Sequence, residues 1–502
     1  MRYGFAIDQR TCIGCHACTV ACKTEHEVPV GQFRTWVKYV DQGTFPNNTR
    51  DFGVMRCNHC TDAPCVAICP TQALFKRDDG IVDFDGERCI GCKSCMQGCP
   101  YDAIYIDENT HTAAKCNFCA HRVDEDLEPA CVVVCPTHSI WVGDLDDPDS
   151  GISRLVNSNP VSVRAPEQNT GPNVFYLGAD RAVLDPLAAP VDGSYLFSSP
   201  DPHRAEVSAD LPVDPVTGAR TTLNTPHPRP WGWRVTTYLW TKAVGGGALL
   251  VAALAALVGV DLGVLGTVVA PALGVAGAAV TGALLVWDLK RPERFLYIFL
   301  KPNFRSWLVL GAYTLAGFSL VAGVWLVLGI AVEAGVITSA DTALTVLAVL
   351  GVPAGAMVAG YTGFLFGQAE GRDLWQSPLL FWHLIVQAVM VGAGALVLCG
   401  GGGNGLVVGA LAVATVVHGL MLVLEYGGRH GGRHAASAAH MITHGRYART
   451  FWLGAVAPVV AAAVLAPLGG GVPAVVAGIA VQAALLAYES VFVRAGQDVP
   501  LS

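Results

Sequence analysis

The sequence predicts two fold classes in one chain, an α+β domain followed by an all-α bundle of eight transmembrane helices. The first prediction rests on cysteines: all but Cys399 lie between Cys12 and Cys135, in four groups of four. The second rests on composition, because long runs of Ala, Val, Leu and Gly after about residue 231 carry very few charges. At 502 residues, the chain is long enough for several domains.

The cysteine groups have the spacing of iron–sulfur ligands. The first and third groups follow C-x2-C-x2-C-x3-C, the bacterial ferredoxin pattern, while the second and fourth each widen one gap. Each 4Fe-4S cluster takes four thiolates, so the sixteen cysteines match four clusters in a ferredoxin-like polycluster domain. The predicted ligands are Cys12, Cys15, Cys18, Cys22, Cys57, Cys60, Cys65, Cys69, Cys89, Cys92, Cys95, Cys99, Cys116, Cys119, Cys131 and Cys135.

Disulfides and zinc are the alternatives for these cysteines. A C-x2-C pair rarely closes on itself as a disulfide, and zinc ribbons lack the recurring third and fourth cysteines. Proline follows the last cysteine of three groups, at Pro70, Pro100 and Pro136, as in ferredoxins, whereas Lys23 follows the first group. The pattern therefore favours iron–sulfur ligation.

The fourth cysteine of each group predicts how the groups combine. In two-cluster ferredoxins this cysteine serves the other cluster. We therefore expect the second and third groups to exchange Cys69 and Cys99, and the first and fourth to exchange Cys22 and Cys135. Short β-type runs at 80–84 and 103–106 would support the loops, and the clusters would supply much of the stability.

Charge separates the two halves of the chain. Residues 1–230 carry a formal charge of −11 and residues 231–502 a charge of +3, which together give −8. An acidic domain argues against nucleic acid as a partner, because nucleic acid attracts the opposite sign.

Eight apolar runs approach or reach the length that spans a bilayer. A soluble fold would have to bury eight helices that have almost no polar face. Pro458, Pro467 and Pro473 interrupt the last two runs, and Met1–Arg10 lacks the apolar core of a secretory signal. The predicted spans are 239–260, 264–287, 307–332, 342–366, 378–399, 404–426, 451–468 and 472–493.

The loops between these spans predict the orientation. All thirteen Lys and Arg residues after position 230 fall on one side, and the opposite loops carry none. Short basic loops stay in the cytoplasm. We therefore expect a multi-pass protein of the inner cell membrane, with both termini and the cysteine domain in the cytoplasm. The thirteen are Arg234, Lys242, Lys290, Arg291, Arg294, Lys301, Arg305, Arg372, Arg429, Arg433, Arg446, Arg449 and Arg494.

Composition also predicts the domain boundaries. The cysteine domain should occupy residues 1–180 and the membrane domain residues 231–502. Residues 181–230 carry nine prolines and are typical of a semi-extended linker.

Both halves resemble subunits of one enzyme family. Residues 1–180 resemble the four-cluster electron-transfer subunit of the dimethyl sulfoxide and polysulfide reductases, in the cysteine spacings and in the segments 143–148 and 172–177. The bundle resembles the NrfD-type membrane subunit, through Asp288-Leu289-Lys290-Arg291-Pro292-Glu293-Arg294-Phe295 and the continuation at 301–307. Most relatives keep these as two chains, so a fusion is the main departure.

The resemblance implies a complex. A separate catalytic subunit with a molybdopterin-type cofactor would act on the substrate, the clusters would carry electrons, and the membrane domain would exchange them with quinone or quinol. Nothing in the chain resembles a pterin-binding domain. Oxidation of a substrate such as formate or sulfite would send electrons to quinone, and a cytoplasmic domain favours this direction. Reduction of a sulfur compound would instead draw electrons from quinol.

A quinone pocket is expected at the cluster side of the bundle, because electrons must reach it from the clusters. Buried ionisable groups in a membrane span are costly and mark function, and His, Asp or Glu can deliver the protons that a quinone needs. The candidates are Trp233, Arg234, Tyr238, Lys242, Asp288, His383, Gln387, His418 and Glu425.

Each candidate has a structural alternative. Arg234, Lys242 and the segment 290–305 would anchor the membrane interface, and Asp288 would pair with Arg291 or Arg294. His383 and His418 would bridge helices, or hold a b-type haem, which the resembled family argues against because its NrfD-type members lack haem. The histidines at 430, 434, 440 and 444 form a metal site or, more simply, a solvated basic loop.

The sequence thus predicts an electron-transfer and membrane-anchor subunit without a substrate site of its own. Two other functions stay open. The chain could be a module of a proton-pumping quinol complex with c-type haem partners, or a stand-alone relay from ferredoxin to quinone.

Overall fold

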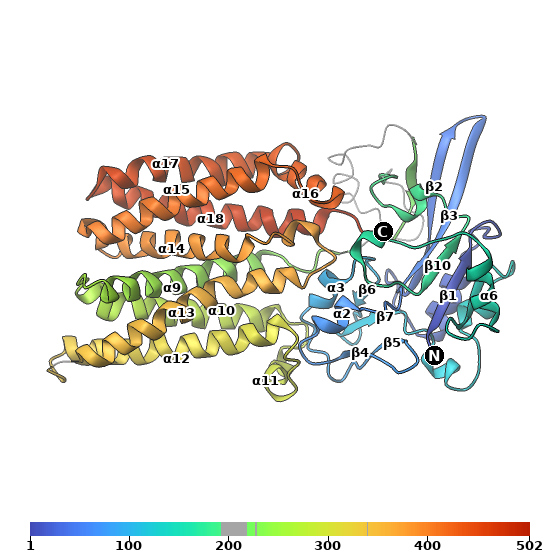
Figure 1. The fold of residues 1–502 in the computed structure, drawn as a ribbon, viewed down its shortest axis with the longest axis horizontal. Coiled ribbons are helices and arrows are strands. Elements are labelled where there is room, and N and C mark those ends of the chain that lie inside the picture. Colours follow the sequence, from blue (N-terminus) through green and yellow to red (C-terminus); the bar gives the residue numbers. More distant parts are fainter. Residues whose placement is uncertain (192–217, 226–227, 339) are drawn as a thin grey trace.

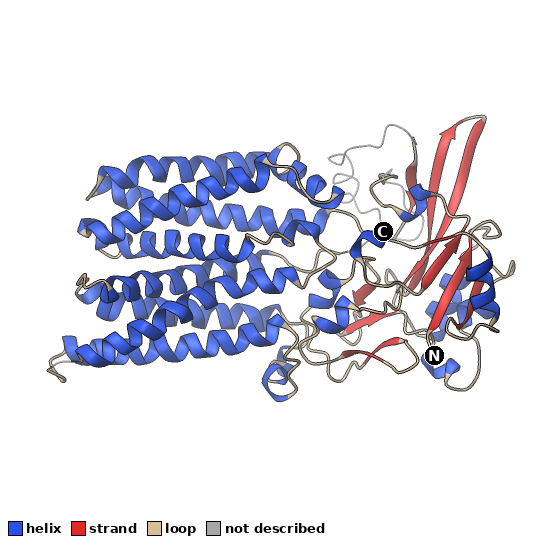
Figure 2. Cartoon of the chain, in the orientation of Figure 1, coloured by secondary structure: helices blue, strands red, loops and turns tan. Residues whose placement is uncertain are grey.

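The computed structural model describes residues 1–191, 218–225, 228–338 and 340–502. A domain of strands, short helices and loops lies at one end, and a bundle of long helices extends from it (Figures 1 and 2). The C-terminus lies at the junction of the two parts. This is the predicted fold class, a cysteine-rich α+β domain followed by an all-α bundle.

The main sheet of the cysteine domain combines strands from the beginning and the end of that domain's sequence. The order is β8-β1-β10-β9, and β1 pairs parallel with β10 and antiparallel with β8. The residues of β1 are almost all buried, as expected for a central strand. The strands of this sheet are β1 (Tyr3–Asp8), β8 (Ile140–Asp144), β9 (Val161–Ser162) and β10 (Val174–Leu177).

Three smaller sheets complete the strand content of the described residues. β2 and β3 form a long hairpin to which β11 adds, while β4–β5 and β6–β7 are short hairpins beside the cysteine loops. The two short hairpins contain the predicted β-type runs at 80–84 and 103–106. The strands are β2 (Thr35–Thr44), β3 (Asn47–Arg56), β11 (Arg220–Leu223), β4 (Leu74–Lys76), β5 (Val82–Phe84), β6 (Ile104–Ile106) and β7 (Ala113–Lys115).

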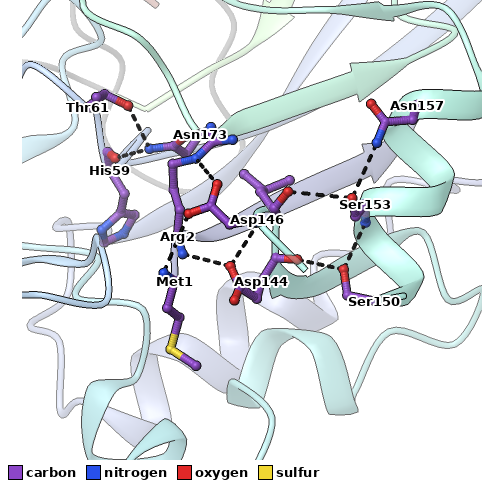
Figure 3. Close-up of polar contacts among 11 residues, drawn as sticks. Met1, Arg2, His59, Thr61, Asp144, Asp146, Ser150, Ser153, Asn157 and Asn173 are labelled. Atoms are coloured by element: carbon purple, nitrogen blue, oxygen red, sulfur yellow. Dashed lines mark hydrogen bonds and ion pairs between the residues drawn. The ribbon is translucent and has the colours of Figure 1, made fainter. Parts of the chain in front are cut away.

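Polar contacts fix the N-terminus against this sheet (Figure 3). The Arg2 amide donates to the Asp144 carboxylate at 2.7 Å, and its guanidinium donates to the Asn173 amide oxygen at 2.9 Å. Asn173 in turn donates to the His59 carbonyl at 2.7 Å, between the second cysteine group and β10. These bonds hold the loops of the cysteine domain at fixed positions on the sheet.

Short helices follow several of the cysteine loops, and α6 packs on β8. The Ser150 side chain caps α6 by accepting from the Ser153 amide. These helices are α1 (Ala17–Glu25), α2 (Pro64–Ala67), α3 (Ser94–Gly98), α4 (Ala120–Val123), α5 (Ala130–Val133), α6 (Gly151–Ser158) and α7 (Arg181–Leu184).

Eight helices in the described part of the chain are long and apolar enough to cross a bilayer, as predicted. Helices satisfy every backbone polar group internally, which lipid requires. The first begins six residues before its predicted span and the last ends five residues after its own, about one and a half turns each, on the side of the cysteine domain. They are α9 (Trp233–Leu257), Leu265–Asp288 including α10 (Ala270–Asp288), α12 (Trp307–Glu333), α13 (Asp341–Gly367), α14 (Leu380–Leu398), α15 (Gly405–Gly427), Thr450–Leu468 including α17 (Ala457–Leu465), and α18 (Val472–Asp498).

Helix α9 lies at the centre of the bundle and packs against α10, α13, α14 and α18. Glycines allow its closest approach to α14, because a Cβ atom at Gly247 would collide with the backbone of Ala388. Such small-residue contacts are typical of membrane helices. The connections at the cluster side include α11 (Tyr297–Leu300) and α16 (Arg433–Thr443).

The predicted linker at 181–230 lies only partly within the described residues, because 192–217 and 226–227 fall outside them. Its described ends pack on the cysteine domain. α7 contacts the hairpin of β2 and β3, and β11 pairs with β2.

Candidate cluster relay and quinone pocket

The cysteines meet across groups, as the sequence predicted. One cavity is lined by Cys12, Cys15, Cys18 and Cys135, which we call the outer set. Another is lined by Cys69, Cys89, Cys92 and Cys95, the inner set. In both cavities the fourth cysteine comes from a different group from the other three.

The remaining eight cysteines also combine by exchange. Cys22 interacts electrostatically with Cys116, Cys131 and Cys119, and these four form the second set. Cys65 interacts with Cys99, Cys57 and Cys60, and these four form the third set.

The chemistry around the thiols fits iron–sulfur clusters. Backbone amides donate to sulfur atoms, from Gly91 and Ala113 to Cys89 at 3.4 Å each, and from Ser139 to Cys135 at 3.2 Å. Such bonds stabilise the negative charge of a thiolate-bound cluster. The inner and outer sets therefore combine four thiols with amide donors, an arrangement that suits a 4Fe-4S cluster.

Neighbouring sets form a continuous series. Cys18 of the outer set interacts electrostatically with Cys131 of the second, and Cys116 of the second with Cys57 of the third. Cys65 of the third set interacts with Cys95 of the inner set. The series begins near solvent, where Cys15 is exposed, and ends at the bundle.

An apolar cavity of about 530 Å³ opens in the bundle directly beside the inner set. Its wall includes Cys92 of that set, together with side chains from α9, α10, α11, α12 and α13. The polar side chains at its edge are few, namely Tyr238, Asp288, Ser319, Tyr361 and Ser94. A large apolar pocket with a few polar groups is the usual form of a ligand site.

Tyr238 and Asp288 are the two predicted site residues that line this cavity. Trp233 and Arg234 lie next to it, on a more polar cavity of about 710 Å³ between the cysteine domain and the bundle. Asp288 lines both cavities and so stands between them.

The ion pairs of Asp288 differ from the predicted alternative. Its carboxylate lies 2.6 Å from the Lys93 ammonium and 3.7 Å from the Arg234 guanidinium. Arg291 instead pairs with Glu293, and Arg294 donates to the carbonyls of Gly86 and Cys89. The pairing of Asp288 with Arg291 or Arg294 was therefore wrong, because those arginines turn toward the cysteine domain.

Lys93 directly follows the predicted ligand Cys92, and its ammonium group contacts Asp288 of the bundle. Burial lowers the pKa of Lys93, while the Asp288 carboxylate acts in the opposite sense. The pair joins the two halves of the chain at the edge of the apolar cavity.

Lys242 lies inside the bundle, away from the basic loops at its cluster-side end. The side chain is 2% exposed, and its ammonium donates to the Ala359 carbonyl at 2.8 Å and to the Thr362 hydroxyl at 2.5 Å. It also lies 4.6 Å from the centroid of the Tyr361 ring, which lines the cavity. The interface-anchor alternative was wrong for Lys242. The residue lies in the third turn of α9 and is buried among the other helices, away from the membrane interface.

A separate group between α14, α15 and α18 contains His383, His418 and Glu425. His383 Nε2 lies 2.8 Å from His418 Nδ1, and His383 Nδ1 lies 3.2 Å from the Glu425 carboxylate. Tyr488 donates to the same carboxylate at 3.1 Å. Three predicted site residues, His383, His418 and Glu425, are thus brought together, while Gln387 is buried one turn further along α14; none of the four lies on the wall of the apolar cavity.

The loop at 288–306 binds the cysteine domain. The Lys290 and Arg291 amides donate to the carbonyls of Gly91 and Ile90, each at 3.2 Å. The Asn303 side chain donates to the Cys69 carbonyl at 2.8 Å. The segment that carries the family resemblance is therefore the one that docks the cluster loops.

Sequence reasoning missed a second docking contact. Arg372, shortly after the end of α13, is 5% exposed and donates to the Gln97 side chain at 2.9 Å and to the Gln497 carbonyl at 3.2 Å. Gln97 also bonds Gln497, at 2.7 Å. The signal in the sequence was weak, since a glutamine beside a cysteine group looks like any surface residue.

The histidine-rich loop forms helix α16. His440 and His444 stack with ring centroids 5.4 Å apart, and Arg433 pairs with Asp185, which directly follows α7 in the predicted linker. Within the described residues, no group of three or more His, Cys, Asp or Glu side chains converges to hold a single metal ion, so the metal-site alternative for these histidines gains no support.

Two family profiles match the chain, one in each half. The 4Fe-4S dicluster domain matches residues 49–145, and the polysulphide reductase NrfD family matches residues 221–500.

Curated relatives resemble the cysteine domain. A tetrathionate reductase subunit of Salmonella typhimurium is 46% identical over 190 residues, 37% of this chain and 76% of that protein. One of the polysulfide reductase chains of Wolinella succinogenes is 37% identical over 187 residues, 37% of this chain and 98% of the relative. The arsenate respiratory reductase iron-sulfur subunit of a Shewanella species is 35% identical over 225 residues, 35% of this chain and 96% of the relative.

Proposed function

We propose that this chain connects a catalytic subunit to the quinone pool. The premise is that it belongs to the polysulphide reductase NrfD family and carries an iron–sulfur electron-transfer subunit fused to it. The catalytic subunit would be of the molybdopterin type and would contain the substrate site. The fused chain would conduct electrons between that site and the membrane.

The single observation that carries the proposal is the position of Cys92. This predicted ligand of the inner set forms part of the wall of the 530 Å³ apolar cavity. Bound in the four cysteine sets, 4Fe-4S clusters supply one-electron carriers. A quinone ring in the cavity would then lie next to the last carrier of the series.

Different residues of the cavity would bind the quinone and transfer its protons. The apolar walls from α10 and α12 hold the ring and tail of a lipid-soluble molecule. The Tyr238 hydroxyl can donate to one quinone carbonyl. Asp288 stands between this cavity and the polar cavity that contains Lys290 and Arg372, so it can pass protons between water and the ring.

The outer set is the proposed point of electron exchange with the catalytic partner. Cys15 is exposed and Cys12 and Cys135 are only half-buried, whereas the third set is fully buried. The names of the relatives support a partner of this kind, because each of the three is a subunit or chain of a reductase.

The basic loops at the cluster-side end of the bundle support a cytoplasmic position for the cysteine domain. The loops that contact this domain contain Lys290, Arg291, Arg294 and Arg372. Because short basic loops face the cytoplasm, the cysteine domain would lie on that side.

Purification from native membranes in mild detergent tests the proposal. We expect a large pterin-containing subunit to accompany the chain, and cluster signals to respond when a quinol is added. Multihaem cytochromes in place of that subunit would instead assign the chain to a proton-pumping quinol complex. A chain that arrives alone and reduces quinone from soluble ferredoxin would be an independent relay.

A further inference from the structure

Arg56 is a buried cation in the middle of the cysteine domain. It ends β3, directly before the first cysteine of the second group, and its side chain is 0% exposed. A buried guanidinium without a counter-charge is very costly, so such a group is normally paired with a carboxylate. Within the described residues, no carboxylate forms an ion pair with Arg56. Its positive charge must therefore be balanced by another kind of group.

The groups around Arg56 are cluster ligands. Its Nη1 lies 3.3 Å from the Cys131 sulfur of the second set. Ionised sulfur atoms at Cys131, Cys116 and Cys18 would each attract the guanidinium, and Cys18 belongs to the outer set. Arg56 therefore stands at the junction between the outer and second sets.

Two nitrogen atoms of the guanidinium have no hydrogen-bond partner among the described residues. Nε and Nη2 are buried, while the ring of Phe5 lies over the guanidinium carbon at 4.3 Å. A planar fork of donors that lacks protein acceptors suits an anionic group with several sulfur atoms. The thiolates and the sulfides of a 4Fe-4S cluster are such a group.

We propose that Arg56 is the fixed positive charge that raises the reduction potentials of the two outermost clusters and so tunes electron exchange with the partner. This inference rests on the proposed four-cluster function. A cluster gains negative charge when it is reduced, so a cation in the same low-dielectric site stabilises its reduced form. Hydrogen bonds to the cluster sulfur atoms act in the same direction.

The position of Arg56 limits the effect to part of the relay. The inner set lies at the opposite end of the series, next to Lys93 and Asp288. Removal of the Arg56 charge should therefore shift the midpoint potentials of the outer and second clusters downward and leave the inner cluster unchanged.

The test is a redox titration of the intact complex, followed by electron paramagnetic resonance, with four variants. Arg56→Met removes the charge, Arg56→Gln removes the charge but keeps a donor, and Arg56→Lys keeps the charge without the fork. Arg50→Gln is the matched control, since Arg50 lies on the same strand in an exposed pair with Asp41. We expect lower potentials for two clusters in the Met and Gln variants, a smaller shift in the Lys variant and none in the control.

Each result decides the proposal. A full iron content with all four potentials unchanged in Arg56→Met or Arg56→Gln would overturn it. If both neutral variants lose iron while Arg56→Lys retains it, the charge is required and the proposal stands, whereas iron loss in all three variants would assign Arg56 to packing alone. Fewer than four cluster signals in the unmodified chain would contradict the proposed function itself, before any variant is compared.

Discussion

In the proposed function, single residues at the edge of the apolar cavity would connect electron transfer to proton transfer. Asp288 is the clearest case, because its carboxylate binds Lys93 beside the inner set and lines both the apolar and the polar cavity. A role in proton transfer requires the carboxyl group itself, whereas a role in docking requires only a polar partner for Lys93.

Asp288→Asn separates these roles. We expect quinone reduction by the complex to fall by about 10²-fold or more, because proton transfer by a positioned side chain contributes on that order. The clusters should still be reduced by dithionite at full iron content. Glu293→Gln is the control, since Glu293 is exposed in the same loop. Quinone turnover close to the unmodified rate in Asp288→Asn would remove Asp288 from the proton path.

Cys57 tests the ligand assignment. Cys57→Ser should remove the cluster of the third set and interrupt the series between Cys116 and Cys65. We expect loss of one paramagnetic signal and of about a quarter of the iron, since each cluster needs four thiolates. Cys399→Ser, which changes the single cysteine outside the groups, should keep all the signals. An unchanged spectrum in Cys57→Ser would contradict the assignment.

Among the secondary-structure elements, the loop at 288–306 determines how closely the clusters approach the bundle. Asn303 donates to the Cys69 carbonyl, and the Ser306 hydroxyl donates to the Ile68 carbonyl at 2.7 Å, so two side chains hold the backbone of one ligand segment. Both side chains are buried, and each unsatisfied partner would cost about 1–3 kcal/mol.

The double variant Asn303→Ala with Ser306→Ala should therefore slow cluster reduction by quinol more than reduction by dithionite, which needs no docking. Stopped-flow absorbance of the clusters measures both rates. Asn404→Ala is the control, because Asn404 caps α15 at the far end of the bundle, where its loss should cost about 1 kcal/mol of stability without a rate effect. Equal slowing with both reductants would mean that the loop supports folding and not electron transfer.

Local patterns predicted most of the elements, but not the contacts between the halves. Sixteen cysteines at ferredoxin spacing and eight apolar runs are local signals, and both indicated the fold class. Lys93 and Asp288 are 195 residues apart. Asp288 was a predicted site residue, but nothing in the sequence indicated Lys93 as its partner. Nor did the sequence indicate the pairing of Gln97 with Gln497, 400 residues apart. The extra turns at the start of α9 and the end of α18 escaped prediction because these ends are stabilised by the cysteine domain rather than by lipid.

At the scale of the whole molecule, the fusion places the contacts proposed for electron transfer at one end of the bundle. The cysteine sets, the apolar cavity and the basic loops gather there, while the far end has short loops without Lys or Arg. Such an asymmetric molecule inserts in one orientation, because basic loops resist transfer across the membrane. In the proposed function, the orientation decides on which side of the membrane a quinone would exchange its protons.

Cys399 gives a direct measure of this orientation. It is exposed at the end of α14, opposite the cysteine domain, and it lies outside the predicted ligand sets. If the basic end is cytoplasmic, a thiol reagent that cannot cross membranes should label Cys399 in intact spheroplasts but not in sealed inside-out vesicles. Cys399→Ser provides the background, and detergent-opened vesicles show full labelling. Labelling from the cytoplasmic face alone would reverse the orientation, and protons for the quinone would then come from outside the cell through the polar cavity beside Asp288.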